Sequence, residues 1–120
     1  MCIRDRRDGF TTQLETNKRW AERIKAAGGT LRFIDMDSPY FHASITPMPP
    51  SACIYSAEEV AQGVFNFIQE LRKSFPDVVV GDIEPLLWGL GMRVDQIKTW
   101  LDTYYRVTGE NLPYILMDVG

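Results

Sequence analysis

The sequence has few of the residues that mark several common classes of protein. Its 120 residues include only two cysteines and one histidine, His42. It carries 16 acidic and 13 basic side chains without a basic tract, so we expect no nucleic-acid partner. No apolar run approaches the roughly 18 residues of a transmembrane helix, so we expect no membrane partner. The proportions that remain, 45% hydrophobic and 24% charged, are typical of a globular domain.

The first residues stand apart from the rest of the chain. MCIRD is the translation of ATGTGTATAAGAGACAG, a transposon end used in sequencing libraries, and its two leftover bases can begin the codon of Arg6. We therefore expect residues 1–6 to be technical read-through and exclude them from fold reasoning. The alternative is a genuine short basic start. Without these residues Cys53 is the one remaining cysteine, which predicts neither a disulfide framework nor a zinc site.

Apolar residues at helical spacing predict three helices. The first covers roughly residues 13–27, and Gly28 and Gly29 follow it, as glycine often does past a helix end. The second begins with a capping box formed by Ser56 and Glu59 and ends before Pro76. The third covers roughly residues 94–108.

An apolar strand follows each helix. The predicted strands are LRFIDM (31–36), VVVGDIEP (78–85) and YILMDV (114–119). Helices that alternate with continuously apolar strands favour an α/β fold with a parallel sheet covered by helices. A complete (β/α)8 barrel needs about 250 residues. We therefore expect residues 7–120 to be about three helix–strand units of an incomplete (β/α)8 barrel, truncated at both ends.

All three strands end in acidic residues. Side chains two apart along a strand share a face, and in each strand the acids continue an apolar face. They are Asp35 and Asp37, then Asp82 and Glu84, then Asp118. If these faces point into a barrel, the acids rise into its mouth, where such barrels build their active sites. We therefore expect one shared cleft. The alternative is that each acid starts a loop, caps the next segment or pairs with an arginine.

Paired carboxylates predict the cleavage of a glycosidic bond, because one can protonate the leaving oxygen while the other acts as base or nucleophile. We predict that Glu84 is the acid/base, since its side chain is the longest at a strand end and Pro85 follows it. Like-charge repulsion from Asp82 and Asp118 would raise its pKa. Asp37 and Asp118 are both candidates for the opposing carboxylate.

Aromatic side chains follow the ends of the predicted strands. They suit a carbohydrate, because the C–H faces of a sugar stack on flat rings. We expect substrate contacts from Tyr40, His42 and Trp88, and also from Asp35 and Asp82. For His42 the alternative is a loop residue hydrogen-bonded to a neighbour. We expect neither a cofactor nor a bound metal, and the oligomeric state is left open.

Two stretches, SACIYSAEEVAQGVFNFIQELRKSFPDVVVGDIEP and LPYILMDVG, resemble bacterial glycoside-hydrolase-like (β/α)8 barrel proteins. The resemblance covers roughly residues 30–120, and its motifs are a strand-terminal D-x-D, G-D-I-E-P and a final M-D-V. It implies a barrel fold, a carbohydrate-associated role and a secreted or periplasmic location. The Asn-Glu pair of many retaining glycosidases is absent, because Ile83 precedes Glu84.

Two other functions stay open on the sequence alone. The five strand-end carboxylates supply the oxygen ligands that Mg²⁺ or Mn²⁺ prefers, as in a metal-dependent barrel enzyme. A non-enzymatic barrel would instead bind a saccharide without cleaving it. Removal of divalent metal separates the first alternative from a glycosidase, and activity on chromogenic glycosides separates the second.

Overall fold

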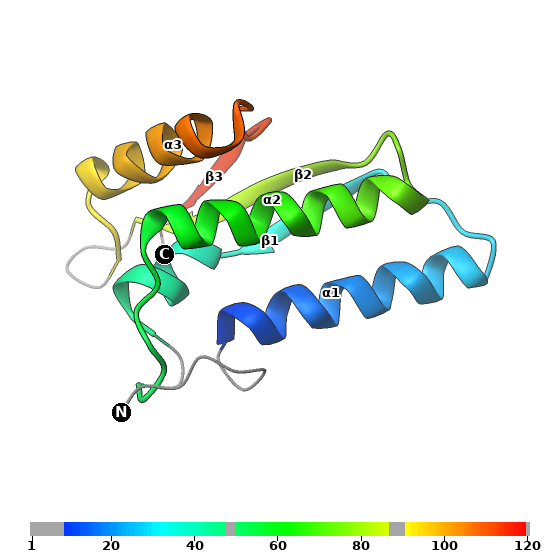
Figure 1. Ribbon diagram of the computed structural model, residues 1–120, viewed down its shortest axis with the longest axis horizontal. Coiled ribbons are helices and arrows are strands. Elements are labelled where there is room, and N and C mark those ends of the chain that lie inside the picture. The colour runs from blue at the N-terminus through cyan, green and yellow to red at the C-terminus, as the bar shows by residue number, and fades with distance from the viewer. Residues whose placement is uncertain (1–8, 48–49, 87–90, 120) are drawn as a thin grey trace.

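The computed structural model describes residues 9–47, 50–86 and 91–119 of the chain. Its elements are α1 (Gly9–Ala26), β1 (Phe33–Asp37), a short π-helix η1 (Phe41–Ile45), α2 (Ala57–Ser74), β2 (Val79–Pro85), α3 (Val94–Thr108) and β3 (Ile115–Asp118) (Figure 1). The three predicted helices and three predicted strands are therefore confirmed, although α1 begins earlier than expected. No helix is predicted at residues 41–45, where the π-helix lies. The expectations for residues 1–6 and Trp88 fall outside the described ranges.

The three strands form one parallel sheet in the order β1-β2-β3. Between β1 and β2, Asp35 lies beside Gly81 and Asp37 lies beside Ile83. Between β2 and β3, Pro85 lies beside Asp118. The expected α/β fold with a parallel sheet is confirmed. Because laterally paired residues of a sheet share a face, this register decides which strand-end acids lie on the same side.

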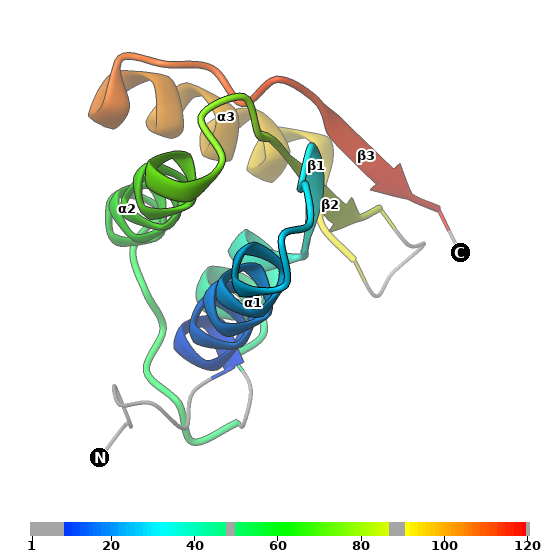
Figure 2. The same ribbon diagram turned by 90° about the vertical axis from the view of Figure 1, so that its right-hand side faces the viewer.

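The helices pack on one face of the sheet, and the opposite face is uncovered over the described residues (Figure 2). On the covered face Met36 and Val80 are buried in the core. On the uncovered face Phe33 keeps 65% of its surface exposed and Leu116 keeps 47%. The two faces of β1 and β3 therefore differ sharply in their access to solvent.

Local signals explain where the helices begin and end. The capping box of α2 is confirmed, because the Glu59 N–H donates to Ser56 Oγ and the Ser56 N–H donates to Glu59 Oε1, each over 3.1 Å. Gly28 adopts φ 78° just past α1, and Gly109 adopts φ 76° at the end of α3. Glycine enters this left-handed region at little cost. The apolar residues whose helical spacing predicted α2 are buried. They are Val60, Val64, Phe67, Ile68 and Leu71 within the helix and Phe75 just past its end.

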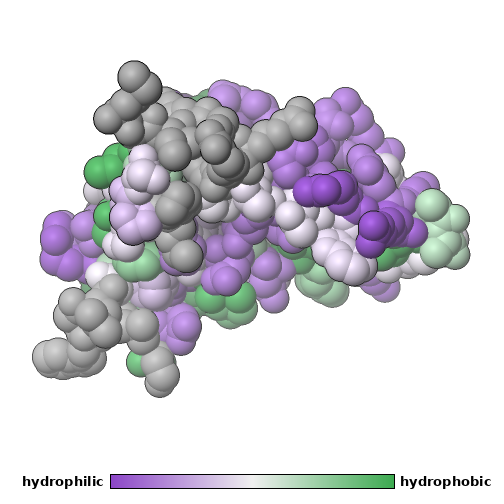
Figure 3. All heavy atoms as spheres, turned by 90° about the horizontal axis from the view of Figure 1, so that it is seen from below, coloured by the Kyte–Doolittle hydropathy of each residue, from purple (hydrophilic) through white to green (hydrophobic). Residues whose placement is uncertain are grey.

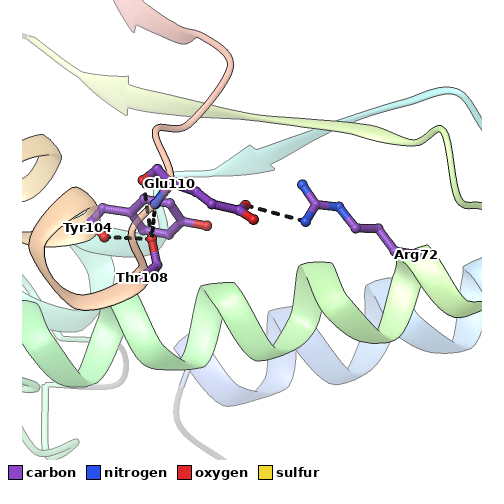
Figure 4. A network of polar contacts seen from close by, with 4 residues as sticks. All are labelled: Arg72, Tyr104, Thr108 and Glu110. Carbon is purple, nitrogen blue, oxygen red and sulfur yellow. Dashed lines mark hydrogen bonds and ion pairs between the residues drawn. The ribbon is translucent and has the colours of Figure 1, made fainter.

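A small polar network connects the turn after α3 to α2 (Figure 4). Thr108 Oγ1 donates to the Tyr104 carbonyl over 2.7 Å and accepts from the Glu110 N–H over 3.1 Å. Glu110 reaches Arg72 of α2 over 3.4 Å. The ion pair is partly exposed and contributes little by itself. Its consequence is positional, because the network fixes the turn that leads from α3 into β3.

The outer side of α1 is mostly hydrophilic, as the view from below shows (Figure 3). Exposed charged residues of this helix include Arg19, Glu22 and Arg23. None of the described helices has the length and apolar character that crossing a membrane requires.

Cys53 is buried and disulfide-bonded, so the expectation of an unpaired cysteine is wrong.

Candidate functional site

Three of the predicted carboxylates lie on the uncovered face of the sheet. Asp35 and Asp37 are exposed on β1, and Asp118 is exposed at the end of β3. The residues of β2 between them on this face are Gly81, Ile83 and Pro85. Carboxylates therefore lie on the two outer strands of the sheet, and the middle strand presents no charged side chain on this face.

Tyr114 connects the two outer strands across Gly81. Its hydroxyl donates a hydrogen bond to Asp35 Oδ1, and this bond is the main reason that the pKa of Tyr114 lies above its ordinary value. A Cβ at position 81 would lie 2.1 Å from the Tyr114 ring. Glycine at this position therefore allows the ring to cross β2 and reach Asp35.

Asp37 stands at the carboxyl end of β1, where the chain turns into η1. Ser38 adopts φ 51°, and its hydroxyl donates to Asp37 Oδ1 over 3.2 Å. The Gln13 side chain of α1 donates to the Asp37 carbonyl over 2.7 Å. A left-handed residue that is not glycine costs energy and persists only where the surrounding structure holds it. Gln13 holds the backbone of Asp37, and the Ser38 hydroxyl orients its side chain.

A hollow of about 210 Å³ opens beside Asp37, between the beginning of α1 and η1. Its lining residues are Gly9, Phe10, Gln13, Asp37, Pro39 and His42. Nδ1 of His42 is buried and lacks a hydrogen-bond partner within the described segments. Two of the predicted site residues, Asp37 and His42, therefore line the same hollow. Its other walls are mostly apolar, as is usual for small-ligand sites.

The remaining two carboxylates, Asp82 and Glu84, lie on the covered face and are fully buried. Asp82 Oδ2 accepts from Trp100 Nε1 of α3 over 2.7 Å. Glu84 accepts from the backbone N–H groups of Tyr40 and Phe41 over 2.9 and 3.1 Å. The two side chains share one face of β2 and influence each other's pKa.

Burial dominates the acid–base properties of this pair. Desolvation raises the pKa of Asp82 from 3.8 to about 7, against the opposing effect of the Trp100 hydrogen bond. Desolvation and then the Asp82 charge raise the pKa of Glu84 from 4.5 to about 9. Like charges at short distance cannot both ionise cheaply. The expected influence of Asp82 on Glu84 is therefore present, but burial is the larger cause.

The expected single cleft of five carboxylates is wrong. The register pairs Asp37 with Ile83 and Asp118 with Pro85, so both lie on the face opposite Glu84. Within each strand the predicted alternation holds, but β2 presents its acids to the helices. Glu84 therefore cannot share an open cleft with Asp37 and Asp118 in this arrangement.

The predicted substrate contacts also divide between the faces. Asp35 is exposed, whereas Asp82 is fully buried. The ring of Tyr40 is buried and stacks on Trp100 at 5.0 Å, so it does not reach the uncovered face. Trp88 lies outside the described residues.

Three residues that shape these sites are not among the predicted site residues: Trp100, Tyr114 and Gln13. Trp100 carries a weak signal, since a tryptophan on the apolar side of a helix places an N–H donor in the core that needs an acceptor. Gly81 within an apolar strand is a second signal, because such a glycine often marks the close approach of another group. Gln13 gives no sequence signal that distinguishes it from other polar residues of α1.

Within residues 9–47, 50–86 and 91–119, no three His, Cys, Asp or Glu side chains come together as a metal ion would require. Comparison of the chain with protein-family models, with curated proteins and with solved structures finds no match.

Proposed function

We propose that this chain is part of a glycoside hydrolase built on a (β/α)8 barrel, and that Asp37 and Asp118 are its paired carboxylates. The observation that supports this most is their shared position. Both are exposed on the uncovered face at the carboxyl ends of parallel strands. In a barrel the face without helices points inward, and active sites form at the carboxyl ends of the strands.

The register supports a workable separation between the two carboxylates. Their strands flank β2 and therefore lie about 10 Å apart. Asp118 is level with Pro85, two residues beyond the Ile83 level of Asp37, which adds about 7 Å along the strands. The backbones are thus roughly 12 Å apart. Side chains that lean across β2 would bring the carboxyl groups into the range of about 5–9.5 Å that glycosidases use.

The proposed mechanism assigns one carboxyl group to protonating the leaving oxygen and the other to acting as base or nucleophile. Asp35 and Tyr114 would accept and donate hydrogen bonds to sugar hydroxyls beside this pair. Gln13 and His42 would do the same in the hollow next to Asp37. Glu84, the acid expected from the sequence, has no catalytic role in this proposal because it faces the helices.

The test is hydrolysis of a panel of chromogenic glycosides by the purified chain and by Asp37→Asn and Asp118→Asn. Each substitution removes a proton-transfer group while keeping the size of the side chain, so we expect rates to fall at least about 100-fold. Asp77→Asn is the matched control, because Asp77 is exposed near the opposite ends of the strands. Hydrolysis rates of the Asp37 and Asp118 variants equal to the rate of the control would contradict the proposal. Activity that chelation abolishes and Mg²⁺ restores would contradict it too. So would binding of a saccharide without hydrolysis.

A further inference from the structure

The Glu84 carboxyl group joins β2 to the segment that follows Asp37. Its Oε1 accepts from the Tyr40 N–H over 2.9 Å and its Oε2 from the Phe41 N–H over 3.1 Å. The neighbouring Ile83 carbonyl accepts from the Ser38 N–H over 2.7 Å. Three hydrogen bonds to two residues of β2 thus hold residues 38–41, immediately before His42.

Asp82 lies two residues before Glu84 on the same face of β2. Both side chains have no exposed surface, and Asp82 Oδ2 is already occupied by Trp100 of α3. Asp82 Oδ1 is buried with no protein N–H or other fixed donor beside it in the described part of the chain. A proton on Glu84 would give that oxygen a donor, and one proton held by two buried carboxyl groups removes the repulsion between two charges.

We propose that Glu84 is a positioning residue that holds residues 38–42, and with them Asp37 and His42, in the geometry of the hollow, and that one proton held by Glu84 and Asp82 relieves the repulsion between these two buried groups. The functional part of the inference rests on the proposed glycosidase site. The structural part, that Glu84 fixes this segment, stands on the hydrogen bonds alone.

The proposal implies a change at the Tyr40 and Phe41 amides when the pair loses its last proton. With a pKa of about 7 for Asp82 and about 9 for Glu84, the pair keeps one proton between these values and none above them. Burial and the Asp82 charge oppose the charged form of Glu84, whereas the hydrogen bonds from the Tyr40 and Phe41 N–H groups favour it, so loss of the last proton changes the charge directly at these two amides. Two tyrosines are the other ionisable groups beside the pair. The pKa of Tyr40 is raised, first by burial and then by the charges of Glu84 and Glu58. Tyr104 packs on Trp100.

The experiment is amide hydrogen exchange at Tyr40 and Phe41, followed by NMR. In Glu84→Gln one carboxyl oxygen becomes an NH2 group that cannot accept from a backbone N–H. In Glu84→Asp the shorter side chain cannot reach either amide. We expect exchange at these amides to accelerate about tenfold, which corresponds to about 1.4 kcal/mol per lost hydrogen bond. Glu70→Gln, an exposed residue of α2, is the control and should leave both amides unchanged.

A second measurement covers variants that fail to fold. In the unmodified chain, the Trp100 indole N–H resonance should shift with a midpoint near 7, and the Tyr40 and Phe41 amide resonances with a midpoint near 9. Unchanged exchange in folded Glu84 variants, or amide resonances that do not move with pH, would overturn the proposal. Both readouts are independent of hydrolysis. Failure of the proposed function would therefore leave the role of Glu84 standing, and failure of the Glu84 test would leave the proposed function standing.

Discussion

Replacing Trp100 with alanine is expected to lower the free energy of unfolding by about 4 kcal/mol. The side chain has no exposed surface. Its ring stacks on Tyr40 with a centroid distance of 5.0 Å and meets Tyr104 edge-on with a centroid distance of 5.7 Å. Its N–H donates a hydrogen bond to Asp82 Oδ2. Alanine would leave a cavity between α3 and the sheet and would remove a hydrogen bond to a buried carboxyl group. Urea denaturation at pH 6 measures the effect.

Two further variants separate packing from hydrogen bonding. Trp100→Phe keeps most of the ring but removes the N–H, so we expect a loss of about 1–3 kcal/mol, the cost of a buried acceptor without a partner. Tyr105→Ala removes a ring from the exposed side of the same helix, where 56% of its surface faces solvent, and should cost far less. Equal losses for Trp100→Ala and Tyr105→Ala would contradict the described packing of α3.

The stability of the chain is expected to fall as pH rises from about 5.5 to 9. Asp82 and Glu84 have folded-state pKa values of about 7 and about 9, above their ordinary values of 3.8 and 4.5. In this window the folded chain therefore holds protons that the unfolded chain has released. Each such proton lowers the free energy of unfolding by about 1.4 kcal/mol per pH unit. The loss ends once pH passes the folded-state pKa of Glu84.

Other carboxyl groups do not mask this trend. Hydrogen bonds and ion pairs lower the pKa of Glu58, Glu70 and Asp95, so their contribution is lost only as pH falls into the acid range. Urea midpoints measured across the window test the prediction. The double substitution Asp82→Asn with Glu84→Gln should flatten the curve, because neither amide titrates. A stability that is constant or rises from pH 5.5 to 9 would contradict the buried, proton-sharing pair.

Most of the fold follows from local signals in the sequence. The Ser56–Glu59 capping box and the apolar stripe after it define α2, and Gly28 marks the end of α1. Three apolar strands separated by helices predict the parallel sheet that is observed. The π-helix at residues 41–45 could not be predicted, because contacts from β2 and α1 hold that segment and its own residues show no helical period.

The division of the strand-end acids between two faces could not be predicted in the same way. Alternation along a strand tells which residues of that strand share a face, but it does not tell which face meets the helices. Both faces of β2 carry apolar residues, Val80 on one and Val79 with Ile83 on the other, so its pattern does not identify the covered side. The register with β1 decides the matter by placing Asp82 beside Met36 and Asp37 beside Ile83. The prediction that Glu84 shares a face with Asp37 and Asp118 is therefore wrong, whereas Asp37 and Asp118 do lie on the same face.

The most direct test of this account is the reactivity of the carboxyl groups toward a water-soluble carbodiimide and glycine ethyl ester, followed by peptide mass spectrometry. The folded chain should be modified rapidly at Asp37 and Asp118, which are exposed, and hardly at all at Asp82 and Glu84, which have no exposed surface. Denatured chain should react at all four positions. Modification of Glu84 in the folded chain as fast as that of Asp37 would contradict the assignment of these acids to opposite faces.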